Sequence, residues 1–302
     1  MPALLAYSTS DSPVLEEVAP QQLGPTDVRI RVAAAAVNPV DVGVLRGPVR
    51  ALTGLPDPVG LGWDVSGIVA EVGSEVTGLS PGDAVAGILH VIVRKPSVGS
   101  HADETVLPAN AVARIPDGLD LTDAASVPLN ALTARQALDL FGPAEGRNLL
   151  VTGGAGAVGG HAIVLAAREG WRVTALARES DADFVARAGA DLVTELPRAS
   201  FDAVLDAAVL LESALAAARD GGSFVGVAPG SPVAAERGIT VHTVSVEPDS
   251  AAIAKLLGFA ADGTFEIRVA GRVPLHDAEK AYDKVASGSQ RGRWLIVPGG
   301  QR

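Results

Sequence analysis

The stretch from Asn148 to Ala167, NLLVTGGAGAVGGHAIVLAA, constrains the fold more than any other part of the chain. An apolar run ends in a glycine-rich turn, and apolar residues at helical spacing follow it. The order of strand, tight turn and helix, with the spacing G-x-G-x-x-G, is typical of a turn that binds a dinucleotide pyrophosphate. The six predicted cofactor contacts in this turn are Gly154, Ala155, Gly156, Ala157, Val158 and Gly159.

Each glycine of the turn has its own expected purpose. Gly154 is expected to let the chain reverse, Gly156 to let backbone N–H groups approach the pyrophosphate, and Gly159 to let helix and strand pack closely. The anion would then lie at a helix N-terminus, where unpaired N–H groups and the helix dipole favour negative charge.

Arg178 follows the next apolar run, Trp171 to Ala177, which completes a strand–helix–strand unit. At this place an Asp or Glu accepts a hydrogen bond from the ribose 2′-hydroxyl of NAD, whereas an Arg suits the 2′-phosphate of NADP. We therefore predict NADP(H) as the cofactor. The adjacent Glu179 leaves NAD open as an alternative, and a solvated loop charge is the other interpretation of Arg178.

Composition limits the class of protein and its partners. A length of 302 residues suits two domains. The formal charge of −11 argues against nucleic acid and anionic membranes as partners, because both require basic patches. The chain has no cysteine, which removes disulfides, thiolate metal sites and cysteine nucleophiles and fits a cytoplasmic location. We expect neither a signal peptide nor a transmembrane helix.

The pattern of elements predicts an α/β protein with two domains. Short strands and Gly/Pro turns in the first third favour a small barrel-like domain. Strands and helices alternate in the central third, which is the pattern of a doubly wound, mostly parallel sheet. We predict a first domain over residues 1–121, completed by residues 263–302, and a nucleotide-binding domain over residues 122–262.

Three local predictions accompany this division. Thr122 is a candidate N-cap of the helix that opens the second domain. A helix is expected from Glu212 to Arg219. Val241 to Val246 alternates as an edge strand of the parallel sheet, and because exposed edges are usually paired or covered, we predict a homodimer through this strand.

Motifs along nearly the whole chain resemble those of the medium-chain dehydrogenases/reductases of the zinc-independent quinone oxidoreductase type. The matching segments are Val37-Asn38-Pro39-Val40-Asp41, Gly67-x-Val69-x-x-Val72-Gly73, Gly82-Asp83-Ala84-Val85, Ala124-Ala125-x-x-Pro128-Leu129-x-x-Leu132-Thr133-Ala134, the turn Gly154–Gly159, Gly189-Ala190-Asp191, Asp206 and Arg291-Gly292-Arg293. Arg293 stands where that family usually has Lys.

The resemblance implies a GroES-like β-barrel catalytic domain and an inserted Rossmann domain, with the chain returning to the first domain at its C-terminus. In that family the cofactor lies in the cleft between the domains. Thr133 would then face the nicotinamide, and the loop after Val227 and the strand near Val244 would close over the cofactor.

The zinc-dependent alcohol dehydrogenases of the same family have an early Cys, a Gly-His-Glu and a later Cys as their ligand signatures. Here those places hold Asn38, Gly62-Trp63-Asp64 and Leu129. Because zinc favours thiolate and imidazole ligands, we predict no metal. Without a Lewis acid an alkoxide is difficult to stabilise, whereas hydride addition to a quinone or an α,β-unsaturated carbonyl delocalises the charge.

We therefore predict an NADPH-dependent reductase of a quinone or enone. Two alternatives remain open: a 2-enoyl thioester reductase, and a cofactor-binding sensor or structural protein with little turnover.

Four residues are candidates for the chemistry, each with a structural alternative. Asn38 would donate its amide N–H toward the substrate or the nicotinamide, and Asp41 would orient neighbouring groups, although Asn-Pro-x-Asp is also a side-chain-capped turn. Arg46 would hold an oxyanion or a phosphate, or else form a surface salt bridge. Asn130 would face the cleft, or else lie on the polar face of a helix.

Further candidates are less specific. Trp63 lines an apolar substrate pocket or packs in the core. The five histidines have no ligand spacing, so a structural or exposed position is expected for each, and a substrate contact in the loop after Gly82-Asp83 is the alternative for His90. Relatives often have a tyrosine two residues after the Asp of Asn-Pro-x-Asp, where this chain has Gly43, and neither Tyr7 nor Tyr282 matches a family proton donor. Water is therefore the expected proton source.

Overall fold

The computed structural model describes residues 1–228, 233–288 and 290–299. The chain forms two compact units: unit 1 consists of Met1–Leu129 and Glu247–Arg302, and unit 2 of Asn130–Val246. In this division α8 (Ser250–Ala261), which packs against β8 (Val112–Arg114), is part of unit 1. The domain boundaries at residues 121/122 and 262/263 stay a prediction.

Unit 1 is built on two sheets. The larger has seven strands in the order β15-β16-β3-β5-β6-β8, with β7 paired to β3, and the smaller has the order β2-β1-β4. The strands are β1 (Pro2–Ala6), β2 (Val14–Glu17), β3 (Asp27–Val37), β4 (Val59–Gly60), β5 (Asp64–Val72), β6 (Ala84–Ile88), β7 (Glu104–Pro108), β8 (Val112–Arg114), β15 (Val269–Val273) and β16 (Arg293–Ile296).

Short helices connect these strands. They are α1 (Pro39–Leu45), α2 (Pro48–Thr53), α3 (Val91–Arg94), α8 and α9 (Ala278–Ser287), with 3₁₀ turns η1 (Ala109–Ala111), η2 (Asp123–Ser126) and η4 (Leu275–Asp277). Thr122 is the N-cap of η2 as predicted, but its side chain makes no capping bond, and the α-helix expected here begins only at Pro128. Asp120 takes this part: its carboxylate accepts the backbone N–H groups of Thr122 and Asp123.

Strand β3 carries the chain to the candidate site. Along its first half, buried Val28, Ile30 and Val32 alternate with more exposed residues, as expected of a strand with one face on the core. Its end, Ala34 to Val37, is buried on both faces. Asn38 follows at once, and Pro39 begins α1 at a position where a missing N–H costs nothing.

Unit 2 is a six-stranded sheet with the order β11-β10-β9-β12-β13-β14, in which all neighbours are parallel. Counted within the unit, this is the order 3-2-1-4-5-6 of the dinucleotide-binding sheets, so the predicted doubly wound sheet is confirmed. The strands are β9 (Asn148–Thr152), β10 (Arg172–Leu176), β11 (Asp191–Val193), β12 (Phe201–Asp206), β13 (Ala218–Gly226) and β14 (Thr240–Thr243).

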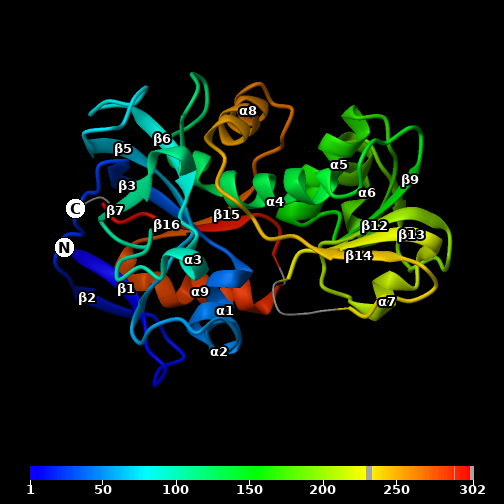
Figure 1. Ribbon diagram of the computed structural model, residues 1–302, viewed down its shortest axis with the longest axis horizontal. Coiled ribbons are helices and arrows are strands. Elements are labelled where there is room, and N and C mark those ends of the chain that lie inside the picture. Colours follow the sequence, from blue (N-terminus) through cyan, green and yellow to red (C-terminus); the bar gives the residue numbers. More distant parts are fainter. Residues whose placement is uncertain (229–232, 289, 300–302) are drawn as a thin grey trace. The chain divides into compact units, whose positions relative to one another are not determined.

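The helices of unit 2 are α4 (Pro128–Asp139, whose first two residues are in unit 1), α5 (Ala157–Arg168), α6 (Ala182–Ala188) and α7 (Glu212–Leu215), with the 3₁₀ turn η3 (Glu179–Asp181). Figure 1 shows α5 and α6 on one side of the sheet and α7 on the other.

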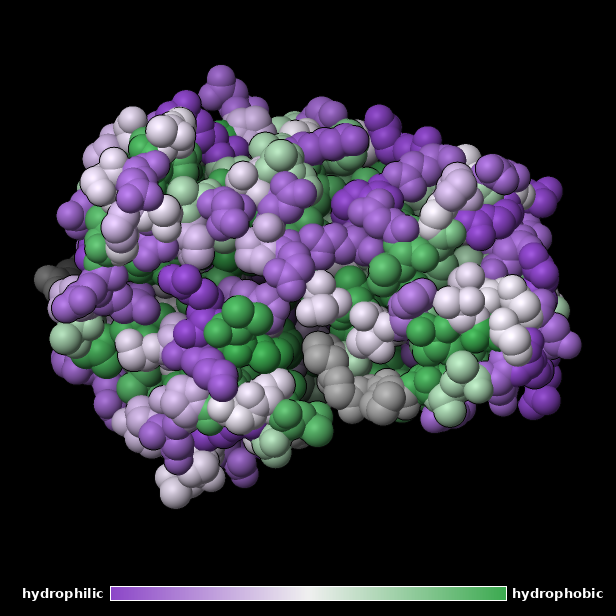
Figure 2. All heavy atoms as spheres, viewed as in Figure 1, coloured by the Kyte–Doolittle hydropathy of each residue, from purple (hydrophilic) through white to green (hydrophobic). Residues whose placement is uncertain are grey.

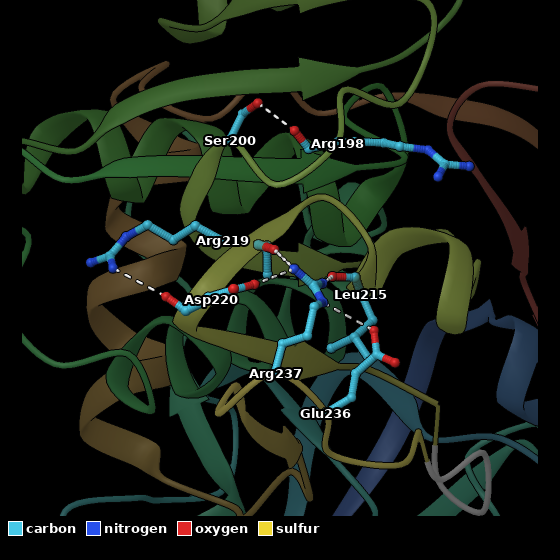
Figure 3. A network of polar contacts seen from close by, with 8 residues as sticks. Arg198, Ser200, Leu215, Arg219, Asp220, Glu236 and Arg237 are labelled. Atoms are coloured by element: carbon cyan, nitrogen blue, oxygen red, sulfur yellow. Dashed lines mark hydrogen bonds and ion pairs between the residues drawn. The ribbon is translucent and has the colours of Figure 1, made fainter.

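The helix predicted from Glu212 to Arg219 is too long. Helix α7 ends at Leu215, and β13 begins at Ala218 despite the helix-favouring alanines. Arg237 closes the helix end, because its Nη2 donates to Leu215 O at 3.1 Å and its Nη1 to Ala218 O at 2.9 Å and Asp220 Oδ1 at 3.0 Å (Figure 3). A contact this far along the chain cannot be inferred from helix propensity.

Polar residues cover most of the face seen in Figure 2, with apolar residues scattered among them. Within the described residues, no helix combines the length and apolar character needed to cross a bilayer.

Candidate active site

The carboxyl ends of the parallel strands in unit 2 meet at one edge of the sheet. Thr152 at the end of β9 is in register with Leu176 at the end of β10 and with Asp206 at the end of β12. Gly226 of β13 is in register with Asp206 and with Thr243 of β14. In open α/β sheets ligands bind at this edge, where the strand order reverses, and here that point lies between β9 and β12.

The glycine turn leaves β9 at this edge. Gly153, with φ +61°, has the left-handed conformation that reverses the chain, so the reversal assigned to Gly154 was placed one residue too late. Gly154 instead packs on β10: an added Cβ would lie 2.7 Å from the Ala175 Cβ, and its N–H donates to Leu176 O at 3.0 Å. At Gly159 a Cβ would lie 2.2 Å from Gly153 O, which is the close approach expected of the third glycine.

Helix α5 begins directly after this turn. Its N-cap Gly156 has no side chain to bond the first backbone N–H groups, and an added Cβ there would meet only Gly153 O, at 3.0 Å. The helix has twelve residues, long enough for its N-terminal N–H groups and dipole to favour an anion. The turn therefore has the geometry of a pyrophosphate cradle.

Arg178 and Glu179 lie one strand away. Both are exposed, and Arg178 follows Leu176, the residue whose carbonyl accepts from Gly154 in the glycine turn, by two positions. The Arg178 backbone N–H donates to Asp181 Oδ2 at 3.3 Å, and the exposed guanidinium has no hydrogen-bond or ion-pair partner within the described residues, which leaves it accessible to a ligand. Glu179 is equally exposed, so NADP stays the predicted cofactor and NAD the alternative, as in the sequence analysis.

Other predicted contacts lie on the same unit. Val227 follows β13, and Val244 follows β14 and donates its backbone N–H to Gly226 O at 2.9 Å. Part of the loop after Val227 lies outside the described residues. Asn130 and Thr133 are both buried on α4 and three residues apart, so they share one face of that helix.

Asp206, predicted from the sequence only as a motif match, also holds the loop that follows β12. Its buried carboxylate accepts the Thr152 hydroxyl at 2.6 Å and the backbone N–H groups of Leu210 and Leu211 at 3.1 and 2.8 Å. These bonds fix the loop after β12 at the ligand-binding edge. The available signal was an Asp at the last position of β12, directly after the apolar run Ala203 to Leu205.

In unit 1 the carboxylate of Asp64 joins two segments that are distant in sequence. Asn38 Nδ2 donates to Asp64 Oδ2 at 2.7 Å, and the backbone N–H of Leu129 donates to Asp64 Oδ1 at 2.7 Å. Asp64 is fully buried at the start of β5, and Asn38 is 1% exposed. Both carboxylate oxygens are therefore engaged by the protein itself.

Asn38, Asp64 and Leu129 occupy the places of the zinc-ligand signatures in the family that the sequence resembles, as set out in the sequence analysis. Here Asn38 turns its amide N–H₂ to Asp64, and Leu129 contributes only a backbone N–H. Zinc requires thiolate, imidazole or free carboxylate donors in tetrahedral arrangement. Among the described residues, no three His, Cys, Asp or Glu side chains are grouped to hold a metal. This donor set does not fit zinc.

Asp41 forms a capping box with Asn38. Its Oδ2 accepts the Asn38 backbone N–H at 2.8 Å, which is the structural alternative considered for this residue. Its Oδ1 is buried and has no hydrogen-bond partner among the described residues. A role in orienting reacting groups stays a prediction.

The two buried carboxyls and Arg293 form one charge cluster. Burial raises the pKa of Asp41 to about 8, to which the Asp64 charge contributes, and burial raises the pKa of Asp64 to about 7. Burial lowers the pKa of Arg293 to about 10, although both carboxylates act to raise it. At neutral pH Arg293 is thus charged and the carboxyl pair retains proton occupancy, which limits the net charge buried here.

Sequence reasoning missed a second buried pair, His101 and Tyr282. His101 Nε2 lies 3.1 Å from Ala36 O, which can only accept, so Nε2 carries the proton and Nδ1 accepts from the Tyr282 hydroxyl at 2.8 Å. Burial lowers the pKa of His101 to about 4, so the ring is neutral. The two residues are 181 positions apart, and no local pattern relates them.

Arg46 lies on the surface, where its Nη2 pairs with Asp283 Oδ1 at 2.7 Å. This is the salt bridge considered as its alternative. Its role at an oxyanion or phosphate stays a prediction.

Comparison with known families agrees with both halves of this description. Residues 24–117 match the model described as "Alcohol dehydrogenase GroES-like domain", and residues 177–296 match the model described as "Zinc-binding dehydrogenase". The chain belongs to the medium-chain dehydrogenases/reductases of the quinone oxidoreductase type. The predicted combination of a GroES-like domain and a Rossmann domain is thereby confirmed. The family binds a nicotinamide dinucleotide.

Two relatives and one solved structure illustrate the likeness of this medium-chain dehydrogenase/reductase. It is 35% identical over 231 residues to a 2-methylene-furan-3-one reductase from Solanum lycopersicum, a match that covers 72% of this chain and 59% of the relative. It is 34% identical over 209 residues to a chloroplastic NADPH-dependent alkenal/one oxidoreductase from Arabidopsis thaliana, covering 66% and 54%.

The quinone oxidoreductase from Coxiella burnetii has the same fold, with a TM-score of 0.86 and 24% identity over 98% of this chain and 99% of that one. The matched region thus spans somewhat more than half of the two curated relatives and nearly all of the solved structure.

Proposed function

We propose that this protein is an NADPH-dependent, zinc-independent reductase that transfers hydride to a quinone or an α,β-unsaturated carbonyl. The observation that carries the proposal is the Asn38–Asp64–Leu129 cluster, which occupies the zinc-ligand places with mutually satisfied hydrogen-bonding groups. A site of this composition has no Lewis acid for an alkoxide, so a conjugated acceptor, whose negative charge is delocalised, suits it better.

The residues of unit 2 fit the dinucleotide. The start of α5 would hold its pyrophosphate in the turn formed by Gly154, Gly156 and Gly159. This turn has no room for a side chain at Gly159, where an added Cβ would lie 2.2 Å from Gly153 O. Arg178 would pair with the 2′-phosphate, and the relative named as NADPH-dependent supports this preference. When bound, the dinucleotide supplies the hydride.

The chain's own residues would bind and orient the reactants. Asp64 fixes the Asn38 amide through the 2.7 Å bond to Nδ2, so the amide has one defined orientation. Thr133 and Asn130 would contact the nicotinamide and the substrate from α4. Since the buried hydroxyl of Tyr282 is already engaged with His101, we assign the proton added after hydride transfer to water.

The test is NADPH oxidation with a benzoquinone, a naphthoquinone, an enal, an enone and a crotonyl thioester, run in parallel with NADH. Turnover of a quinone, enal or enone with NADPH supports the proposal. Selective turnover of the thioester would replace it with the 2-enoyl thioester reductase. Tight NADPH binding without turnover of any acceptor would indicate a sensor or structural protein.

A further inference from the structure

Trp63, which precedes Asp64 of the Asn38–Asp64–Leu129 cluster in the chain, forms a buried ring contact with His90. The Trp63 carbonyl accepts the N–H of Leu89, the neighbour of His90, at 2.7 Å. The two rings lie with centroids 4.9 Å apart at an angle of 44°. Trp63 is 4% exposed and His90 8% exposed.

The indole N–H of Trp63 is buried and has no hydrogen-bond partner among the described residues. A buried donor without a partner is destabilising, so native proteins rarely retain one without a ligand or water to accept from it. The neighbouring donors, Asn38 Nδ2 and Leu129 N–H, are both satisfied by Asp64. Of these three donors, only the Trp63 N–H lacks an acceptor among the described residues.

His90 adds a second donor. It is the N-cap of α3, and its Nδ1 accepts the backbone N–H of Val93 at 3.3 Å, so the ring proton lies on Nε2. Nε2 has no protein partner within the described part of the chain. Burial lowers the pKa of His90 while the charge of Glu247 acts to raise it, and Nε2 carries a proton in either charge state.

We propose that Trp63 Nε1–H and His90 Nε2–H together bind the oxygen of the carbonyl that is reduced, and that they stabilise the oxyanion formed there. This assignment rests on the proposed function and restricts the substrate to acceptors with a carbonyl oxygen conjugated to the carbon that receives hydride. The ring contact, with centroids 4.9 Å apart, places the two N–H groups on neighbouring side chains.

In the proposed reaction the bound dinucleotide would supply hydride to the β-carbon, the π electrons would move to the carbonyl oxygen held by the two donors, and water would supply the proton that completes the product. The two donors act on the oxygen while it is negative, where each removed donor typically costs on the order of 10²–10³ in kcat.

The first experiment uses Trp63→Phe, which keeps an aromatic ring without the N–H, and His90→Asn, which keeps an acceptor for the α3 cap without Nε2–H. We expect kcat for an enone to fall at least about tenfold in each, with NADPH affinity unchanged. Trp171→Phe, a buried indole of unit 2, and His276→Asn, an exposed histidine, are the matched controls and retain full activity. If wild type is active and both site variants keep its kcat, the assignment is overturned.

A second readout is independent of turnover. 4-Nitrophenol is titrated by its visible absorption in the presence of the protein loaded with NADP⁺. Two donors at one oxygen stabilise the phenolate, so the pKa of the bound phenol should lie below its free value in wild type and in Trp171→Phe, and return toward it in Trp63→Phe and His90→Asn. Equal pKa values in all four proteins would overturn the donor pair. A shift in wild type without turnover of any acceptor would support the pair and reject the proposed reaction.

Discussion

At the scale of single residues, the buried carboxyl cluster ties chemistry to stability. Asp41 and Asp64 lie in an environment that disfavours charge, yet each accepts hydrogen bonds that fix Asn38 and Leu129. Arg293 offsets part of the charge. We therefore expect the cluster to make the free energy of unfolding depend on pH.

Asp41→Asn should flatten that dependence. The folded-state pKa of Asp41, about 8, exceeds the unfolded value of 3.8, so its contribution is complete below the unfolded pKa and is lost as pH rises through the folded pKa. His101, whose folded pKa is about 4, contributes no slope above about pH 6.5. Between about pH 6.5 and 8, wild type should lose up to about 1.4 kcal/mol per pH unit through Asp41, whereas Asp64, with a folded pKa of about 7, contributes only in the lower part of this range.

Urea unfolding across this range measures the effect. Asn at position 41 still accepts from the Asn38 N–H but cannot ionise, so its slope should be shallower than that of wild type. Asp283→Asn, at an exposed carboxylate, should keep the wild-type slope. Identical slopes in all three proteins would remove Asp41 as the source.

Arg178→Ala tests the cofactor assignment. A charged partner of the 2′-phosphate contributes about 1.5–3 kcal/mol, so the Kd for NADPH should rise about 10- to 100-fold while that for NADH stays nearly constant. Arg198→Ala, at another exposed arginine of unit 2, is the control. Fluorescence titration with both dinucleotides measures this, and an equal loss for NADH would contradict a phosphate contact.

The sequence predicted residues whose partners are near in the chain and missed those whose partners are distant. The glycine turn and the Asn-Pro-x-Asp cap are local, and both formed as expected apart from the reversal at Gly153. The bond between Asn38 and Asp64 and the pair of His101 and Tyr282 depend on the registers of β3 and β5 and on the packing of α9. Those contacts arise only from the folded topology.

At the scale of elements, a glycine substitution tests the turn between β9 and α5, with a glycine in α8 as its control. Gly159→Ala would place a Cβ 2.2 Å from the Gly153 carbonyl, which forces the turn or the helix to shift. NADPH binding should weaken by at least about tenfold, since the backbone N–H groups no longer converge on the pyrophosphate.

Gly258→Ala in α8 is the matched control, because an added Cβ meets nothing within 4 Å there. It should leave NADPH binding unchanged and raise the free energy of unfolding by about 0.5–1 kcal/mol. Isothermal titration and urea unfolding measure both variants. Normal NADPH binding by Gly159→Ala would show that the turn is not the cradle.

Elements with strong periodicity were predicted well, and boundaries set by distant contacts were not. The alternation of strands and helices in the central third gave the parallel sheet, because each segment has its own apolar pattern. Helix α7 is shorter than predicted because Arg237 closes it and because β13 follows at once, with Gly222 so close to the neighbouring strand that an added Cβ would lie 3.0 Å from Asp202 O.

At the scale of the whole molecule, β14 carries the prediction of a homodimer. The strand pairs with β13 on one side, and no strand of the described residues covers its other side. Since the Val244 N–H donates to Gly226 of β13, the N–H of the preceding Thr243 points away from that neighbour. Light scattering should give twice the 30.5 kDa chain mass.

Thr243→Pro should shift this mass toward the monomer, because it removes an outward donor without breaking the bond to β13. Thr243→Val keeps the donor and should remain dimeric. A monomeric wild type, or a dimer unaffected by the proline, would place the interface elsewhere or reject it.

The central claim is that hydride is added to the conjugated carbon of an enone. The most direct measurement uses NADPH carrying deuterium at both C4 positions, with mass spectrometry and NMR of the product. The account predicts a saturated ketone with deuterium on the β-carbon and the carbonyl intact. Deuterium on the carbonyl carbon of an alcohol, or no reduced product from a protein that binds NADPH, would contradict it.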